Sequence, residues 1–192
     1  MTLDTREICR YLSLGRREPD EALLARIEAL RPEAIEAIRP RSAWTRFDDW
    51  AANPTLLAAG LRLAESKTLS LHLKDCHAVY LICGTLGPRF DALARRAAVS
   101  SSADALILQA IGAAGIEELM DGAGEAIRAE LREGEALVPR YSPGFGDFPL
   151  EAQRPLLGLL DTSRAIGVSL TDSLLMVPSK SVSAVIGVKA CF

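Results

Sequence analysis

The residues best suited to binding chemistry lie in a short segment around position 140. Arg140 is followed by Pro143 and Gly144 and preceded by Pro139. A guanidinium grips a carboxylate through two parallel hydrogen bonds, which a lysine ammonium cannot form. Gly144 allows close approach of the backbone, and the prolines reduce the entropy lost when the segment adopts one shape. The segment is therefore suited to holding a carboxylate, although Arg140 could instead pair with a carboxylate of the chain and pin the loop.

Glu117 is the second candidate. A helix expected over residues 103–133 directs Glu117 away from Glu118 and onto a face of small and apolar side chains, namely Leu106, Ala110, Ala113 and Gly124. A carboxylate on such a face needs a cationic partner, because an unpaired buried charge is costly. An arginine of the chain, Arg140 included, is one such partner.

Two other groups of reactive side chains are weaker candidates. Ser179 or Ser181 could form a nucleophilic pair with Lys180, but adjacent residues of a strand point to opposite faces. A metal site is disfavoured on the same ground, since alternation along the strand separates its candidate ligands His72, Cys76, His77 and Cys83. We therefore expect a turn lysine, core thiols and surface histidines.

Apolar periodicity and turn residues predict the elements that position these side chains. Helices are expected over residues 5–14, 17–38 (opened by Pro19 and kinked at Pro32), 54–65, 88–98, 103–133 and 150–166. Strands are expected over residues 67–74, 77–83, 168–177 and 181–188. The first half thus reads as helices around one clear strand, 77–83. Residues 138–149, rich in proline, glycine and aromatic side chains, are expected to form an ordered loop that folds onto the domain.

Composition limits the class of protein. The 192 residues are 49% hydrophobic and 24% charged, which is typical of one globular domain. A net charge of -3 without a basic stripe argues against nucleic acid as a partner. No charge-free apolar run reaches the ~20 residues of a membrane helix, and the first residues do not form an apolar signal sequence. We therefore expect a cytoplasmic protein without a membrane partner, its four cysteines present as thiols.

Two ordered motifs resemble the activation domain of cobalamin-dependent methionine synthase. The first is Arg140-Tyr-Ser-Pro-Gly-Phe145, where that family has Arg-x-x-x-Gly-Tyr. The second runs from Leu170-Thr-Asp-Ser through Pro178 to Ser-Val-Ser-Ala184, where the family has a Leu-Thr-Glu-Ser strand, a proline turn and Ser-Val-Ser-Gly. Near the N-terminus, Arg10-Tyr-Leu and Glu18-Pro-Asp20 resemble short, stand-alone members of the family.

The resemblance implies an α+β fold, a single domain (residues 1–192) with a mainly antiparallel sheet surrounded by helices. Within it, an N-terminal helical part (1–66) precedes a part (about 76–188) that binds S-adenosylmethionine. The binding residues implied are Arg140, Tyr141, Pro143, Gly144, Phe145 and Glu117. Glu117 would face the ammonium or sulfonium end of the ligand. Asp172, at the family's acidic position, would contact the ligand or orient the Pro178 turn. Because Phe145 replaces a tyrosine, any hydrogen bond of that hydroxyl is lost here.

The function implied is that of a stand-alone reactivation protein for a cobalamin-dependent methionine synthase. S-adenosylmethionine would donate the methyl group for reductive methylation of oxidised cobalamin, which the partner carries, with a reductant such as a flavodoxin or ferredoxin. No residue of the chain is expected to act as an acid, a base or a nucleophile. One alternative is a module that senses S-adenosylmethionine or docks on another corrinoid protein. A methyltransferase with another acceptor is disfavoured, because no Gly-x-Gly-x-x-Gly loop follows strand 77–83.

Overall fold

The central element is a four-stranded sheet in which every neighbouring pair is antiparallel. The computed structural model describes residues 1–12 and 18–191. The strand order is β1 (Arg41–Asp48), β2 (Cys76–Thr85), β6 (Ser181–Ala190) and β3 (Glu135–Leu137). Two further short strands, β4 (Ser169–Leu170) and β5 (Met176–Val177), form a separate antiparallel pair. The predicted α+β class with a mainly antiparallel sheet is confirmed.

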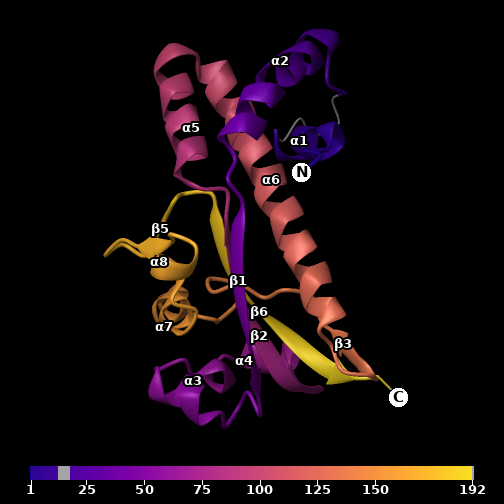
Figure 1. The fold of residues 1–192 in the computed structure, drawn as a ribbon, viewed down its shortest axis with the longest axis vertical. Coiled ribbons are helices and arrows are strands. Elements are labelled where there is room, and N and C mark those ends of the chain that lie inside the picture. The colour runs from indigo at the N-terminus through magenta and orange to yellow at the C-terminus, as the bar shows by residue number, and fades with distance from the viewer. Residues whose placement is uncertain (13–17, 192) are drawn as a thin grey trace.

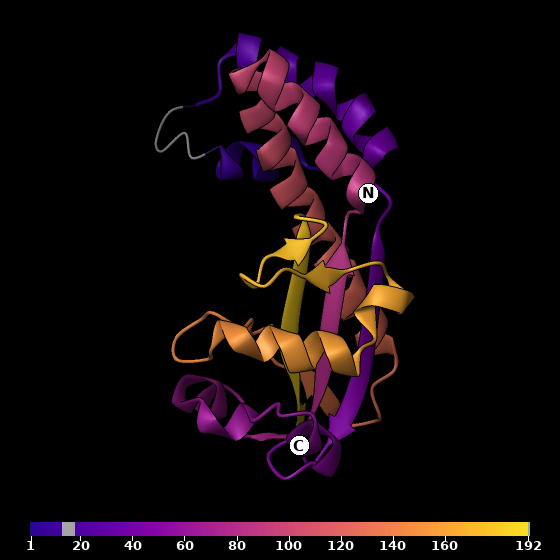
Figure 2. The ribbon, with the colours of Figure 1, turned by 90° about the vertical axis from the view of Figure 1, so that its left-hand side faces the viewer.

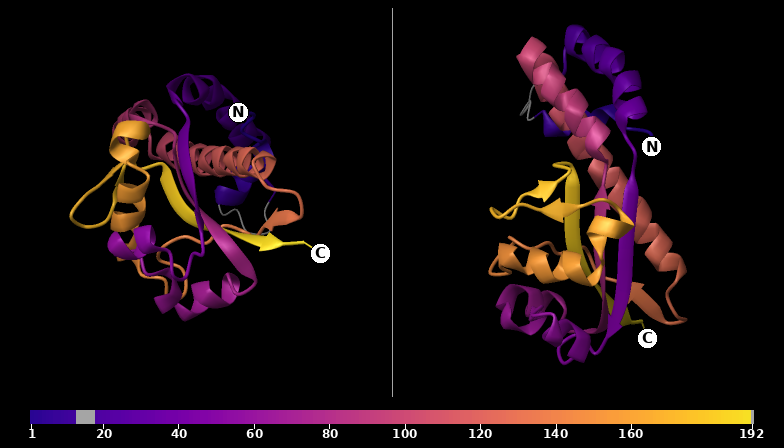
Figure 3. Two further views of the ribbon diagram at one scale, coloured as in Figure 1. Left: turned by 60° about the horizontal axis from the view of Figure 1, so that its bottom comes forward. Right: turned by 60° about the vertical axis from the view of Figure 1, so that its left-hand side comes forward.

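Helices cover the sheet on two sides. A helical group comprises α1 (Thr5–Tyr11), α2 (Glu21–Ala37), α5 (Pro88–Ser100) and the first half of α6 (Ser102–Ala129), whose second half runs down along the sheet (Figures 1 and 2). On the opposite side lie α7 (Gln153–Leu159) and α8 (Thr162–Ala165), with α3 (Pro54–Ala58) and α4 (Lys67–His72) near the end of the sheet (Figure 3). Short 3-10 helices span Leu63–Glu65 and Leu150–Ala152.

Two hydrophobic cores follow from the alternation of the two central strands. On β2, Tyr80 and Ile82 are buried against the side that α6 covers, whereas Val79, Leu81 and Cys83 belong to the core beneath α7. Strand β6 alternates in the same way. Because successive side chains of a strand point to opposite faces, a run that is apolar at every position is expected for a strand covered on both sides. The buried strand expected over residues 77–83 is confirmed and extends to Thr85.

Local capping residues set the starts of several helices. The side chain of Ser101 accepts a hydrogen bond from the amide of Asp104 at the start of α6, as the serine run predicted. The side chain of Asp20 does the same for α2, so Pro19 precedes the N-cap rather than lying in the first turn. Helix α2 continues through Pro32, where a kink was expected.

Several sequence predictions are wrong in type. Residues 67–72 form helix α4 rather than a strand, because side chains of Ser66 and Asp147 accept hydrogen bonds from its first amide groups. Strand β1 was missed and lies inside the segment 1–66, which was expected to be helical. Strand β3 was also missed. Residues 168–177 contain the β4–β5 hairpin rather than one continuous strand.

Other predictions were wrong in extent. The expected helix 54–65 divides at Gly60, which has a φ of 80°. The expected helix 150–166 divides between α7 and α8 at Asp161, which has a φ of 46°. Helix α6 ends at Ala129 rather than near 133. Helix α1 ends at Tyr11, and positions 13 and 14 of the expected helix lie outside the described residues.

Candidate functional site

Arg140 lies on an irregular segment that follows strand β3 and continues along β6. The amide of Val138 donates to the carbonyl of Gly187 at 2.9 Å, and the amide and carbonyl of Tyr141 both pair with Val185 at 2.9 Å. Between these contacts two residues, Pro139 and Arg140, stand opposite the single residue Ile186. This count is that of a β-bulge, which redirects a side chain out of the regular alternation. Pro139, which has no N–H group, cannot continue the ladder there.

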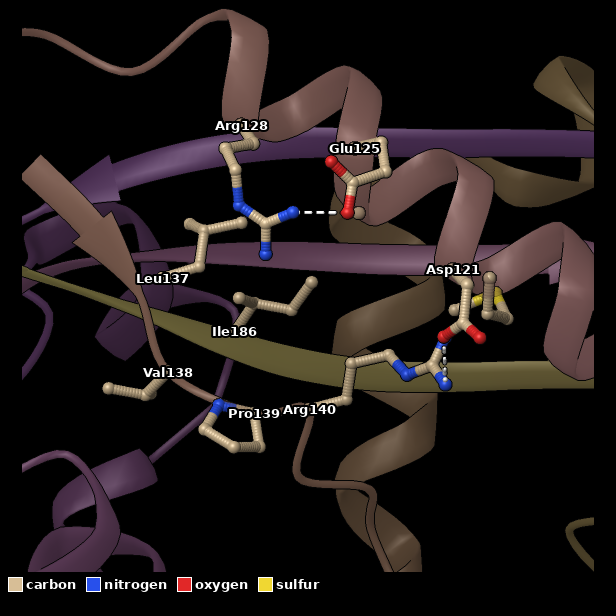
Figure 4. A pocket seen from close by; sticks show the side chains of 10 residues that line it. Asp121, Glu125, Arg128, Leu137, Val138, Pro139, Arg140 and Ile186 are labelled. Carbon is tan, nitrogen blue, oxygen red and sulfur yellow. Dashed lines mark hydrogen bonds and ion pairs between the residues drawn. The ribbon is translucent and has the colours of Figure 1, made fainter.

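The Arg140 guanidinium is directed at helix α6. Its Nη2 donates to Glu117 Oε2 at 2.8 Å and lies 3.0 Å from Asp121 Oδ1, and Figure 4 shows the Asp121 side of this contact. The other terminal nitrogen, Nη1, is buried and has no hydrogen-bond partner within residues 1–12 and 18–191. A buried donor without a partner costs free energy. One terminal nitrogen of Arg140 is therefore engaged by the chain, and the other lacks an acceptor among the described residues.

A cavity of about 480 Å³ adjoins this guanidinium. Charged side chains of α6 form one wall, with Asp121 nearest Arg140 and with Glu125 paired to Arg128 further along (Figure 4). The facing wall is apolar and consists of Leu137, Val138, Pro139 and Ile186. A guanidinium, carboxylates and an apolar wall around one cavity suit a molecule with a zwitterionic end and a flat, weakly polar body.

Sequence reasoning placed Glu117 and Arg140 as candidates, and the structure brings the two together as an ion pair. The small-residue face expected for Glu117 is only partly buried, since Leu106 is exposed and the Glu117 side chain is 41% exposed. Glu118 points elsewhere, as expected, and accepts hydrogen bonds from the amides of Thr2 and Leu3. The contact between Glu117 and Arg140 agrees with a structural ion pair and equally with a joint role in ligand binding.

Asp121 was not identified from the sequence. It follows Glu117 by four positions in the same helix, and residues at that spacing lie side by side on the helix surface. The spacing that places Asp121 beside Glu117 could therefore have been read from the sequence once Glu117 had been assigned to this helix.

Of the predicted binding residues, only Arg140 lines the cavity: Glu117 pairs with its guanidinium outside the lining, and the others lie further along the loop. Gly144 has a φ of 93°, a conformation that favours glycine, and its amide donates to the carbonyl of Phe148 at 2.8 Å. Pro143 is buried, whereas Phe145 is 65% exposed. The hydroxyl of Tyr141 donates to the carbonyl of Phe145 at 3.4 Å. The expected ordered loop is thus found, and the binding roles of Tyr141, Pro143, Gly144 and Phe145 stay predictions.

Asp147, another residue that the sequence did not single out, fastens this loop to helix α4. Its carboxylate accepts hydrogen bonds from Ser66 Oγ at 2.6 Å, from Thr68 Oγ1 at 2.5 Å and from the amides of Lys67 and Thr68 at 2.9 and 3.0 Å. These hydrogen bonds, the one from Ser66 foremost, hold the pKa of Asp147 well below its usual range.

The remaining candidates show no reactive arrangement. Ser179 donates its amide and its hydroxyl to the carboxylate of Asp91, and burial lowers the pKa of Lys180. Asp172 accepts a hydrogen bond from Arg154 through its backbone carbonyl. Within residues 1–12 and 18–191, no three side chains of His, Cys, Asp or Glu lie close enough to hold a metal ion. Over the same residues no helix combines the length and the apolar character needed to cross a bilayer.

Comparison with known proteins agrees with the two motifs. The family described as the activation domain of vitamin B12-dependent methionine synthase matches residues 125–190. Among solved structures, the crystal structure of the MetH reactivation domain bound to AdoHcy aligns with 95% of this chain and 74% of its own length, with a TM-score of 0.62 and 17% sequence identity. No curated protein sequence matches the chain significantly. The chain therefore has the fold of that domain, and the resemblance that the motifs indicated is confirmed over a segment that includes Arg140.

Proposed function

We propose that this chain binds S-adenosylmethionine and supports the reactivation of a cobalamin protein. The observation that carries the proposal is Arg140, which lines the cavity, has an Nη1 without an acceptor among the described residues, and lies in the segment that matches the activation-domain family. The amino-acid end of S-adenosylmethionine carries a carboxylate, which is complementary to the Arg140 guanidinium. Its ammonium group is complementary to Glu117 and Asp121, which lie against the other terminal nitrogen.

The residues of the cavity fit the rest of this molecule. The apolar wall, which includes Leu137, Pro139 and Ile186, offers a surface for the adenosine. The similar solved structure contains AdoHcy, which has the same amino-acid and adenosine ends as S-adenosylmethionine and lacks only its methyl group. This neighbour supports a ligand of the same class here.

S-adenosylmethionine, when bound, supplies a methyl group from its own sulfonium. The chain itself has only to hold the amino-acid end, orient the ligand and exclude water, which is catalysis by position. We propose that the acceptor is oxidised cobalamin carried by a partner, a cobalamin-dependent methionine synthase or another corrinoid protein, with a flavodoxin or ferredoxin as electron donor. The resemblance of Arg10-Tyr-Leu and Glu18-Pro-Asp20 to short family members supports action in trans.

The experiment is reactivation in trans. A methionine synthase that lacks its own activation domain is oxidised to the cob(II) form, supplied with a reductant and S-adenosylmethionine, and followed by its absorption spectrum with and without this protein. We expect methylcobalamin only when the protein is present, and little with Arg140→Ala. Arg164→Ala is the matched control, because this arginine is 88% exposed and contacts Asp161, away from the cavity.

Two results would contradict the proposal at different levels. If S-adenosylmethionine at millimolar concentration gives neither heat nor a thermal shift with the wild-type protein, the binding site is wrong. If the ligand binds but no candidate partner is methylated, the chain is a sensor or a docking module for another corrinoid protein.

A further inference from the structure

We propose that His72 of helix α4 is a positioning residue for Arg140, a role that rests on the proposed function of Arg140 as the ligand-binding arginine. His72 Nε2 lies 2.8 Å from the carbonyl oxygen of Pro139. That carbonyl belongs to the peptide bond that joins Pro139 to Arg140. A carbonyl can only accept, so Nε2 carries the proton and donates.

The hydrogen bond acts where the sheet does not hold the chain. Val138 and Tyr141 are paired with β6 through Gly187 and Val185, whereas the two bulged residues between them stand opposite one residue. The Pro139–Arg140 peptide therefore forms no ladder hydrogen bond with β6. The orientation of this peptide sets the direction in which the Arg140 side chain leaves the backbone. His72 donates a hydrogen bond to this peptide from a different element of the fold.

The His72 ring is itself held by the loop that it contacts. Its centroid lies 5.2 Å from that of the Tyr141 ring, and Tyr141 in turn lies 6.4 Å from Phe148, which is buried. The imidazole thus contacts both residues that flank Arg140, by a hydrogen bond on one side and by ring packing on the other.

Helix α4 is anchored to the far end of the same loop, so it can serve as a fixed support. The four hydrogen bonds of Asp147 join the loop to Ser66, Lys67 and Thr68 at the start of α4. Gly146 lies so close that an added Cβ would be 2.5 Å from Thr68 Oγ1 and 2.7 Å from the Tyr141 hydroxyl. Helix α4 therefore holds the loop at two points: its first turn binds Asp147, and its last residue, His72, binds the carbonyl of Pro139.

The test compares two substitutions of His72. His72→Phe keeps a ring against Tyr141 but removes the donor, whereas His72→Gln keeps an N–H donor. We expect His72→Phe to raise the Kd for S-adenosylmethionine by about two- to tenfold, the range for one lost neutral hydrogen bond, and His72→Gln to change it by less than about twofold. His77→Phe is the matched control, because His77, the second histidine of the chain, contacts Glu135 instead of the loop.

A double-mutant cycle separates positioning from general stability. If His72 acts through Arg140, His72→Phe should cost no further affinity in an Arg140→Ala background, and it should not change the affinity for 5′-methylthioadenosine, which has no carboxylate. Additive losses, or an equal loss for 5′-methylthioadenosine, would overturn the positioning role.

A measurement without ligand keeps this inference separate from the proposed function. In ¹⁵N NMR spectra of the ligand-free protein, the Arg140 side-chain resonance should shift and exchange faster in His72→Phe but not in His72→Gln. An unchanged Arg140 resonance in both variants would overturn the inference even if the wild-type protein binds S-adenosylmethionine. Failure of the wild-type protein to bind would overturn the proposed function, while the NMR comparison would still decide whether His72 orients Arg140.

Discussion

Replacing Arg140 distinguishes a ligand-binding arginine from one that only stabilises the loop. Its partners Glu117 and Asp121 are 41% and 74% exposed, so each ion pair contributes about 1 kcal/mol or less in water. The unpartnered Nη1 opposes this gain, because a buried donor without an acceptor costs about 1–3 kcal/mol. Arg140→Ala removes both contributions. We therefore expect the free energy of unfolding of the ligand-free protein to fall by no more than about 1 kcal/mol.

The effect on the ligand should be much larger. A charge-assisted hydrogen bond to a carboxylate contributes about 1.5–3 kcal/mol, so Arg140→Ala should raise the Kd for S-adenosylmethionine by about 10- to 150-fold. Arg140→Lys keeps the positive charge but not the planar pair of donors, so its affinity should fall between those of the wild type and Arg140→Ala.

Calorimetric titration gives the Kd, and urea denaturation of the ligand-free protein gives the free energy of unfolding. Arg164→Ala serves as the control in both. The reasoning is refuted if Arg140→Ala binds S-adenosylmethionine with the wild-type Kd and instead loses several kcal/mol of stability, because Arg140 would then be part of a structural ion pair alone.

Three further predictions concern the loop that carries Arg140. Phe145→Tyr should leave stability unchanged because the ring is 65% exposed, and if the family's hydroxyl contact is geometrically available here it should tighten binding of S-adenosylmethionine about two- to tenfold in calorimetry; an unchanged Kd would mean that the loop has repacked around the phenyl ring. Gly146→Ala should reduce the free energy of unfolding by about 1–2 kcal/mol, because φ is 55° and the Cβ would meet Thr68; urea denaturation equal to the wild type would contradict that close approach. Because hydrogen bonds lower the pKa of folded Asp147 below the roughly 3.9 of an unfolded chain, its contribution to stability is complete above that value and is lost as pH falls through the lowered pKa. Denaturation from pH 7 to pH 2 should therefore show a shallower acid decline for Asp147→Asn than for the wild type.

Elements with strong local signals were predictable from the sequence. The apolar run of β2 and the serine cap of α6 depend on residues within a few positions of each other, and both predictions are confirmed in type. Helix α4 shows the opposite case. Leu69, Leu71 and Leu73 alternate as in a half-buried strand, yet Leu71 is 70% exposed and the segment is helical. Ser66 supplies a local N-cap, but two of the first amide groups are bound by Asp147, which is remote in the sequence, so the local pattern held only part of the signal for this helix.

Strand β1 was missed for a related reason. It carries arginines at positions 41 and 46, which weaken the apolar signal, and it pairs with β2 at the edge of the sheet. Arg46 is tolerated because it forms two hydrogen bonds with Glu135, a residue of another strand that was also missed. The charged residue of each strand is paired with that of the other, so neither segment can be identified as a strand from its own residues alone.

The same distinction between local and long-range signals applies to the candidate site. Arg140 and Glu117 were found because their side-chain types are unusual for their surroundings, a property that the sequence contains. Their geometry depends on tertiary pairing, since the bulge that aims Arg140 exists only when Val138 and Tyr141 are both in register with β6. His72 could not be selected from the sequence, because its relation to the Pro139 carbonyl requires α4 to be a helix at the edge of the loop. The residues that supply the chemistry are thus visible in the sequence, whereas those that orient them depend on contacts between distant segments, and the comparison of His72→Phe with Arg140→Ala measures how much of the affinity depends on each kind of residue.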